Sequence, residues 1–225
     1  MMARSPAATR LIESFIEGPA GPLEALIQEQ DSAAAAAADP VPVKVAALVC
    51  HPHPLHGGTM HNKVVHRVAS ALHGLGAAVL RFNFRGAGRS AGHHDEGRGE
   101  LEDARAALRF LETRHPEARL WLAGFSFGSW IAARLAASEP AIGQLILIAP
   151  PLHRSDFTLL ETLATPKLVV QGTDDRICVI EALEQAFPRW AEPKEIVRIP
   201  GAGHFFDRML TTLGDEITRA LGAAV

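Results

Sequence analysis

Cysteine is scarce in this chain of 225 residues, and its two copies, Cys50 and Cys178, lie far apart. They cannot build a disulfide framework, and they lack the close spacing of a paired metal site, so we expect a reducing, cytoplasmic setting. The N-terminal residues contain no apolar segment of signal-peptide length. The longest apolar run, near residues 145–151, is far shorter than the ~20 residues of a membrane span. We therefore expect no membrane partner.

A strong excess of charge is also missing. The formal net charge is −3, which gives no general reason to expect nucleic acid or an anionic membrane as a partner. Hydrophobic residues make up 48% and charged residues 21%, as in ordinary soluble proteins. We expect one domain over residues 1–225, with its core at about residues 11–222. The sequence does not decide between a monomer and a homodimer.

Apolar runs of strand length alternate with segments of helical spacing along most of the chain. This alternation predicts a mostly parallel sheet with helices on both faces, the α/β class. The predicted strands are residues 43–50, 77–83, the apolar run before 124, 144–149, 167–171 and 195–199. The predicted helices include residues 62–72, 100–114, a segment after 126, and 205–221.

The connections refine this picture. Glycine and proline at residues 18–22 separate two strand-like runs, 11–17 and 23–28, and predict an antiparallel hairpin at a sheet edge. The alanine-rich residues 31–40 predict a solvated connection. Residues 152–165 have room for one short helix, near 157–163, but not for a lid, so we expect no cap domain.

A Gly-x-Ser-x-Gly sequence, Gly124 to Gly128, stands between an apolar run and an alanine-rich helical segment. This context is the one that a nucleophile elbow requires. Ser126 at the tip of a sharp strand-to-helix turn must adopt strained backbone angles, and the two glycines leave room for close packing. The following helix N-terminus directs free N–H groups at the same point. Ser126 is therefore the candidate nucleophile.

A serine hydroxyl needs a base to take its proton and a third group to orient that base. In the fold that carries this elbow, the chain order is nucleophile, acid, histidine. His204 follows a predicted strand in a glycine-rich loop, and Asp174 and Asp175 follow the preceding one. Sites in open α/β sheets form at these carboxyl ends of strands. His204 is the candidate base, and the two aspartates compete for the third role.

Further motifs resemble the α/β-hydrolase family. Asn83 to Ser90 matches its Arg-Gly-x-Gly-x-Ser turn, and residues 51–58 with Met60 to Lys63 look like a subgroup of small, lidless bacterial serine hydrolases. The resemblance extends from about Leu11 to the C-terminus. It implies a single-domain α/β-hydrolase fold without a cap and without a cofactor. Cys178 is a departure, since relatives commonly carry Val-Pro or a similar pair there.

The resemblance also assigns the acid. The family's Gly-x-x-Asp-x-Val loop matches Gly172, Asp175 and Ile177, which favours Asp175 over Asp174 as the residue that orients His204. An oxyanion hole needs two N–H donors. Phe127 at the helix start supplies the first, and because Pro52 and Pro54 have no N–H, the second comes from His53 or Leu55. The family pattern favours His53.

These residues predict a serine hydrolase that cleaves a carboxylic ester or a similar small acyl substrate through an acyl-enzyme, a carboxylesterase in the first instance. A thioesterase or a small amidase would use the same triad. A non-catalytic binding protein on this fold is the alternative of a different class, because a fold does not fix a function. The expected partner is a small-molecule acyl substrate.

Three other groups of side chains have competing interpretations. Six histidines could bind a metal; they are residues 51, 53, 56, 61, 93 and 94. We expect no metal there, because prolines stiffen the loop that begins at residue 51 and no carboxylate or cysteine lies nearby. Arg85 and Arg89 could contact an acidic substrate or brace their turn. The aromatic residues near Ser126 and His204 could be core, or Phe205 and Phe206 could wall an acyl pocket.

Overall fold

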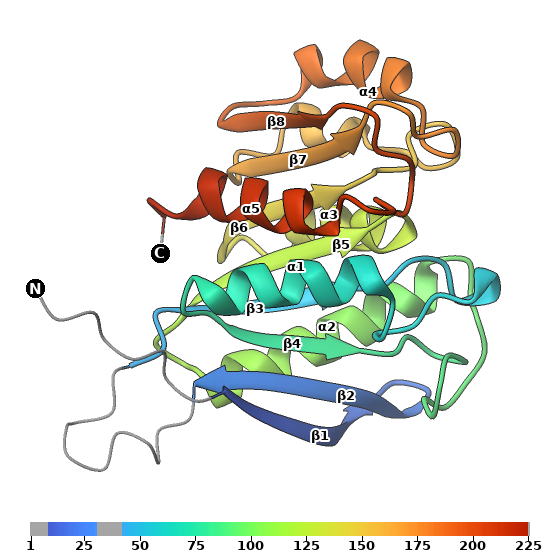
Figure 1. Ribbon diagram of the computed structural model, residues 1–225. Coiled ribbons are helices and arrows are strands. Elements are labelled where there is room, and N and C mark those ends of the chain that lie inside the picture. The colour runs from blue at the N-terminus through green and yellow to red at the C-terminus, as the bar shows by residue number, and fades with distance from the viewer. Residues whose placement is uncertain (1–8, 31–41, 225) are drawn as a thin grey trace, which may run out of the picture.

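The computed structural model describes residues 9–30 and 42–224 of the chain. Eight strands form one sheet in the order β1-β2-β4-β3-β5-β6-β7-β8, which Figure 1 shows from bottom to top. The strands are β1 (Thr9–Gly18), β2 (Gly21–Gln30), β3 (Val45–Cys50), β4 (Ala78–Phe82), β5 (Arg119–Phe125), β6 (Ile142–Ile148), β7 (Lys167–Gly172) and β8 (Lys194–Ile199). The expected class, an α/β sheet with an N-terminal hairpin, is confirmed.

The sheet is antiparallel only at one edge. β1 pairs with β2 across its whole length, from Thr9 opposite Gln30 to Gly18 opposite Gly21, and β2 pairs antiparallel with β4. The remaining neighbours are parallel. Every residue of β3, β4 and β7 is buried, as expected for strands that are covered on both faces.

Helices cover both faces of the sheet (Figure 1). The two faces bury separate hydrophobic clusters, one beneath α1 (Lys63–Gly74) and α5 (Leu210–Leu221), the other beneath α2 (Arg98–Arg114) and α3 (Phe127–Ser138). The elements that complete the chain are α4 (Ile180–Ala186) and the short 3-10 turns η2 (Pro54–His56), η3 (Thr158–Glu161) and η4 (Phe187–Arg189). No helix among the described residues has the length and apolar character needed to cross a bilayer.

Two predicted helices differ from the observed ones. The last helix begins at Leu210 rather than 205, because Phe206 (φ +50°) and Arg208 (φ +63°) adopt left-handed backbone conformations that a right-handed helix excludes. The helix expected at 157–163 is the single turn η3. The helix does not continue beyond this turn, and the carbonyls of Leu163 and Thr165 instead accept hydrogen bonds from the Lys167 amine. The connection predicted at 31–40 lies outside the described residues.

Between β6 and β7 the chain thus inserts no domain. Residues 149–166 form turns and η3 only, and the carboxyl ends of the parallel strands stay uncovered by a cap. The absence of a cap among the described residues, which the sequence predicted, is confirmed. The loops that follow β3, β5, β6, β7 and β8 therefore meet at the right-hand end of the sheet in Figure 1.

Candidate active site

Ser126 sits between the end of β5 and the start of α3, with φ +52° and ψ −120°. A non-glycine residue with these angles is strained, and it persists only where its surroundings hold it. Its N–H donates to the Ile148 carbonyl at 2.8 Å, and its own carbonyl accepts from the Ser129 N–H at 2.8 Å and the Ser129 hydroxyl at 2.6 Å. These bonds fix the strained turn that the motif predicted.

The glycines on either side of Ser126 are required by packing. A Cβ on Gly124 would lie 2.1 Å from the Gly128 carbonyl oxygen, and a Cβ on Gly128 would lie 2.3 Å from the Cys50 carbonyl oxygen. Both distances are far inside van der Waals contact with backbone atoms that cannot swing away. The elbow therefore brings the start of α3 directly against the end of β3, where the next loop begins.

Asp175 follows β7 and is buried. Its Oδ1 accepts the N–H groups of Ile177 and Cys178, each at 2.8 Å, and its Oδ2 lies 2.8 Å from the Nδ1 of His204. Burial raises the pKa of Asp175, but the hydrogen bonds from His204 and from the two N–H groups outweigh it and hold the pKa below its usual value. Asp175 is thus an ionised acceptor.

Asp174 has a different environment. Its side chain is exposed and accepts the Thr173 hydroxyl at 3.0 Å. The structure pairs His204 with Asp175 rather than with its neighbour, in agreement with the alignment of the loop to Gly172. The departure at Cys178 does not disturb the loop, because its N–H still reaches Asp175 and its carbonyl accepts from Gln171 at 2.8 Å.

Ser126 and His204 both line one pocket of about 170 Å³ at the carboxyl end of the sheet. The His204 ring packs on Phe125 at 4.9 Å between centroids and on Phe205 at 5.1 Å. Among the described residues, no hydrogen bond joins the Ser126 hydroxyl to His204. Catalytic hydrogen bonds are often long before substrate arrives and tighten in its complex.

The Cys178 thiol also lines this pocket. Burial raises its pKa to about 12, the nearby Asp175 charge adds to the effect, and the Ser126 hydroxyl and Arg154 oppose it. Cys178 therefore stays a neutral thiol at neutral pH, with little nucleophilic character of its own. Among the described residues, the group of three or more His, Cys, Asp or Glu side chains whose possible ligand atoms all lie within 4.8 Å of one another is Asp175, Cys178 and His204.

The loop after β3 holds His51 and His53 in different ways. His51 is fully buried, with Nδ1 2.6 Å from the Pro52 carbonyl and Nε2 accepting the Phe84 N–H at 3.0 Å. Because Nε2 accepts, the proton is on Nδ1 and the ring is neutral. Burial lowers the pKa of His51 to about 4, partly opposed by its bond to Pro52. His51 is a structural brace for the loop.

His53 and Leu55 were the two choices for the second N–H donor. The Leu55 N–H donates to the His53 Nδ1 at 3.3 Å, within the turn η2. The His53 N–H meets no acceptor among the described residues, and both His53 and Phe127 line the pocket with Ser126. This geometry leaves the His53 N–H free to bind a substrate oxygen and engages that of Leu55.

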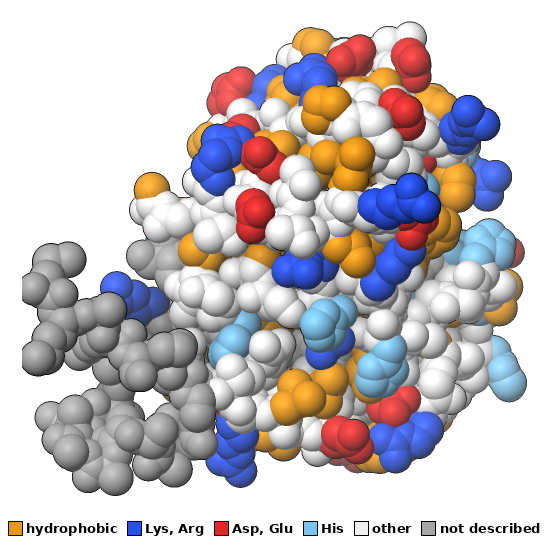
Figure 2. All heavy atoms as spheres, in the orientation of Figure 1, with side chains coloured by type: hydrophobic (Ala, Val, Ile, Leu, Met, Phe, Trp, Pro, Cys, Tyr) orange, Lys and Arg blue, Asp and Glu red, His pale blue; other side chains and the backbone are white. Residues whose placement is uncertain are grey.

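Three histidine rings lie close together beside this loop, with His53 stacked on His56 and tilted against His94. The ring of His53 lies 4.5 Å from that of His56 and 4.6 Å from that of His94, whose Nδ1 is 2.7 Å from the buried Glu100. Burial lowers the pKa of His53, the nearby His94 and His56 lower it further, and Glu100 opposes them. Figure 2 shows histidine and basic side chains along the right-hand edge of the molecule, at the end where the parallel strands terminate.

Arg85 and Arg89 brace the turn after β4. Arg85 makes a bidentate pair with the fully buried Asp103, at 2.9 and 2.8 Å, and Arg89 pairs with Glu24 at 2.7 Å. Neither lines the pocket that contains Ser126. The aromatic pair divides: Phe205 is 41% exposed and lines the pocket, whereas Phe206 is fully buried in the core and does not.

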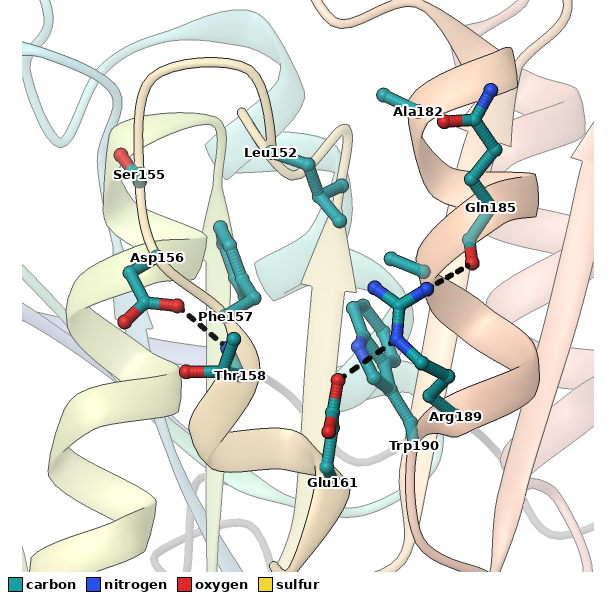
Figure 3. A pocket seen from close by; sticks show the side chains of 11 residues that line it. Leu152, Ser155, Asp156, Phe157, Thr158, Glu161, Ala182, Gln185, Arg189 and Trp190 are labelled. Atoms are coloured by element: carbon teal, nitrogen blue, oxygen red, sulfur yellow. Dashed lines mark hydrogen bonds and ion pairs between the residues drawn. The ribbon is translucent and has the colours of Figure 1, made fainter.

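A larger cavity, of about 350 Å³, lies between the segment that follows β6 and the α4–η4 segment (Figure 3). Phe157 and Trp190 stack at 6.2 Å within it, and Arg189 pairs with Glu161 at its rim. None of Ser126, Asp175 and His204 lines it. Strained backbone and convergent polar groups locate the candidate site in the smaller pocket, so size alone misplaces it.

Comparisons with known proteins agree with this fold. A family model described as serine aminopeptidase, S33, matches residues 53–158. A solved α/β serine hydrolase homologue from Coxiella burnetii is 41% identical, with a TM-score of 0.85 over 93% of this chain and 97% of its own. A serine hydrolase without a lid from Xanthomonas campestris is 37% identical, with a TM-score of 0.86 over 98% of each chain.

An uncharacterized protein of Rickettsia prowazekii is 38% identical over 201 residues, which cover 85% of this chain and 81% of that protein. The fold and these similarities define a hydrolase of the α/β class. The chain belongs to the α/β serine hydrolase family, and the structures similar to it include a member without a lid.

Sequence reasoning did not identify Cys178 as a pocket residue, and it missed three neighbours after β6 that also line the pocket, His153, Arg154 and Ser155. Arg154 follows β6, so its position at the carboxyl end of a parallel strand was a usable signal. It also missed Gln171, whose amide donates to Asp175 Oδ2 at 3.2 Å and to the Cys178 carbonyl. Gln171 ties the acid loop to the end of β7.

Proposed function

We propose that this chain is a serine esterase that cleaves a small carboxylic ester through an acyl-enzyme. Ser126 is the nucleophile, His204 the general base and Asp175 the group that orients its imidazole. The N–H groups of Phe127 and His53 form the oxyanion hole. The observation that carries the proposal is the 2.8 Å contact between His204 Nδ1 and the buried Asp175, behind a pocket that both His204 and Ser126 line.

The chemistry follows from these roles. The Ser126 oxygen attacks the ester carbonyl carbon while His204 takes its proton. The carbonyl π electrons move to oxygen, and the two N–H donors stabilise that negative charge. The C–O bond to the alcohol then breaks, and His204 returns the proton to the leaving oxygen. Water repeats the sequence on the acyl-enzyme, releases the acid and restores Ser126. Thioesters and small amides would use the same steps.

The test is labelling by a fluorophosphonate, which reacts with activated serines. The mass of the intact protein should rise by that of one bound label, and peptide mapping should place the label on Ser126. Ser126→Ala should abolish both labelling and turnover of p-nitrophenyl acetate. Ser155→Ala is the matched control, because Ser155 lines the same pocket and should leave Ser126 labelled. A label on Ser155, Ser129 or Ser90 would contradict the assignment, and no label with no turnover would favour a binding protein.

A further inference from the structure

Arg154 lies in the turn after β6, on the wall of the pocket that contains Ser126 and His204. The turn is fixed, since the Pro151 carbonyl accepts the N–H groups of both Arg154 and Ser155 at 3.0 Å. The Arg154 side chain itself is exposed, and no carboxylate among residues 9–30 and 42–224 pairs with its guanidinium. By contrast, Arg189 at the neighbouring cavity is already paired with Glu161.

The charges around this pocket are one-sided. Of the described residues that line it, none is an aspartate or a glutamate, and Arg154 carries the one permanent charge. Besides His204, three more histidines line it: His53, His56 and His153. The Asp175 carboxylate is buried behind His204, and Glu100 is buried behind His94, so both are removed from the pocket surface.

The influence of Arg154 extends to both sides of the pocket. Its positive charge helps lower the pKa of His53, in the loop after β3, although burial is the larger cause. It also acts to lower the pKa of Cys178, in the loop after β7, against the larger effect of burial. A single unpaired guanidinium whose field spans the mouth of a site attracts an anion to that site.

We propose that Arg154 forms an anion subsite, so that the preferred acyl substrates carry a carboxylate beyond the ester bond that is cleaved. The inference rests on the proposed function, because it names the substrate class of the same site. A planar guanidinium fits a carboxylate through two parallel hydrogen bonds, which gives orientation as well as attraction. The residue is a specificity determinant and takes no part in the bond-breaking steps.

The test compares esters that differ in one carboxylate. The acyl arm uses mono-p-nitrophenyl adipate and p-nitrophenyl hexanoate, which have acyl chains of equal length. The alcohol arm uses the acetate esters of p-hydroxybenzoate and p-hydroxybenzamide. We expect the wild-type protein to prefer the carboxylate in one arm, and the arm that responds tells which part of the substrate faces Arg154.

In Arg154→Gln, kcat/KM for the preferred carboxylate ester should fall about tenfold through KM, with kcat and the neutral ester unchanged. Arg154→Lys should recover part of the preference, and added salt should weaken it. Arg176→Gln is the matched control, because Arg176 is an exposed arginine two residues before Cys178 that does not line the pocket. An equal loss for neutral esters, an equal effect of Arg176→Gln, or no wild-type preference would overturn the subsite.

A second readout does not depend on turnover. Calorimetric titration of Ser126→Ala with monomethyl adipate should give binding that the double variant Ser126→Ala/Arg154→Gln loses. Absent binding in Ser126→Ala would count against the subsite even if esters are hydrolysed. If instead no ester is hydrolysed and no serine is labelled while monomethyl adipate still binds through Arg154, the proposed function fails and the anion subsite stands.

Discussion

The loop after β3 carries His51 and the loop after β8 carries His204, and both rings are buried at the same end of the sheet. Each ring has one nitrogen on a protein acceptor, the Pro52 carbonyl for His51 and the Asp175 carboxylate for His204. Their second nitrogens differ. That of His51 accepts the Phe84 N–H at 3.0 Å, whereas that of His204 has no hydrogen-bond partner among the described residues.

The difference shows what separates a structural histidine from one that can exchange a proton with a substrate. A ring whose two nitrogens are occupied by backbone groups is fixed in one neutral tautomer and has no free lone pair. A ring that is oriented by a carboxylate and lines a pocket with its other edge available can accept a proton and stabilise the charge. The partner of the first nitrogen also matters, since a carboxylate favours the charged ring and a carbonyl does so much less.

The largest expected effect comes from removing the carboxylate partner of His204. Asp175→Asn should lower kcat for the preferred ester by about 10³–10⁴-fold, because an amide stabilises neither the required tautomer nor the imidazolium. The measurement is kcat by steady-state kinetics, with thermal unfolding to show that the variant folds. Asp174→Asn is the matched control and should keep kcat within about twofold, since the exposed Asp174 contacts Thr173 instead. A reversed order of effects would assign the orienting role to Asp174.

The second expected effect concerns stability at acid pH and tests the structural role of His51. The folded pKa of His51, about 4, is below the ordinary value of 6.5. Below pH 6.5, His51 therefore binds a proton in the unfolded chain, whereas in the folded chain it stays neutral until the pH falls to about 4. Stability from this group is unchanged above pH 6.5 and falls as the pH decreases. From about pH 7 to about pH 5 the loss should be about 2 kcal/mol.

The measurement is the free energy of unfolding in urea at both pH values, for the wild type and for His51→Gln. The variant should have a smaller pH dependence, whatever its overall stability. If the variant does not fold, an NMR titration of the wild type gives the same answer, because the His51 ring signals should stay constant down to pH 5. Equal pH dependence in both proteins, or a His51 that titrates near its ordinary value, would remove the contrast with His204.

Much of the fold and of the candidate site could be predicted from the sequence, for local reasons. The elbow around Ser126, the acid loop after Gly172 and the glycine-rich loop before His204 are short motifs in which a few residues dictate the backbone path. Strand and helix order followed from hydrophobic spacing, which a buried sheet imposes on every strand. The choice of Asp175 over Asp174 needed the family resemblance, because both carboxylates occupy the same turn.

The rest depended on tertiary packing that no local pattern records. The predicted start of the last helix was wrong, because Phe206 is buried in the core and both Phe206 and Arg208 have left-handed backbone conformations. Arg154 and Cys178 enter the pocket because loops from different strands converge there, and side-chain direction in such loops is set by their neighbours. The bracing role of His51 could not be predicted from the sequence, since it depends on burial and on the contact with Phe84, which lies 33 residues further along the chain.

The smallest expected effect concerns acyl-chain length and the open surface beside His204. The pocket of about 170 Å³ is small, and its exposed apolar wall is made by Ile177 and Phe205. Each further CH₂ of substrate could gain at most ~0.8 kcal/mol if it were fully buried, and a site without a cap offers little surface to bury it. Values of kcat/KM should therefore change only a few-fold from acetyl to butyryl p-nitrophenyl esters and then decline. No increase should accompany micelle formation. A maximum at palmitoyl esters, or a rise in rate at the critical micelle concentration, would mean that the region beside His204 binds lipid chains.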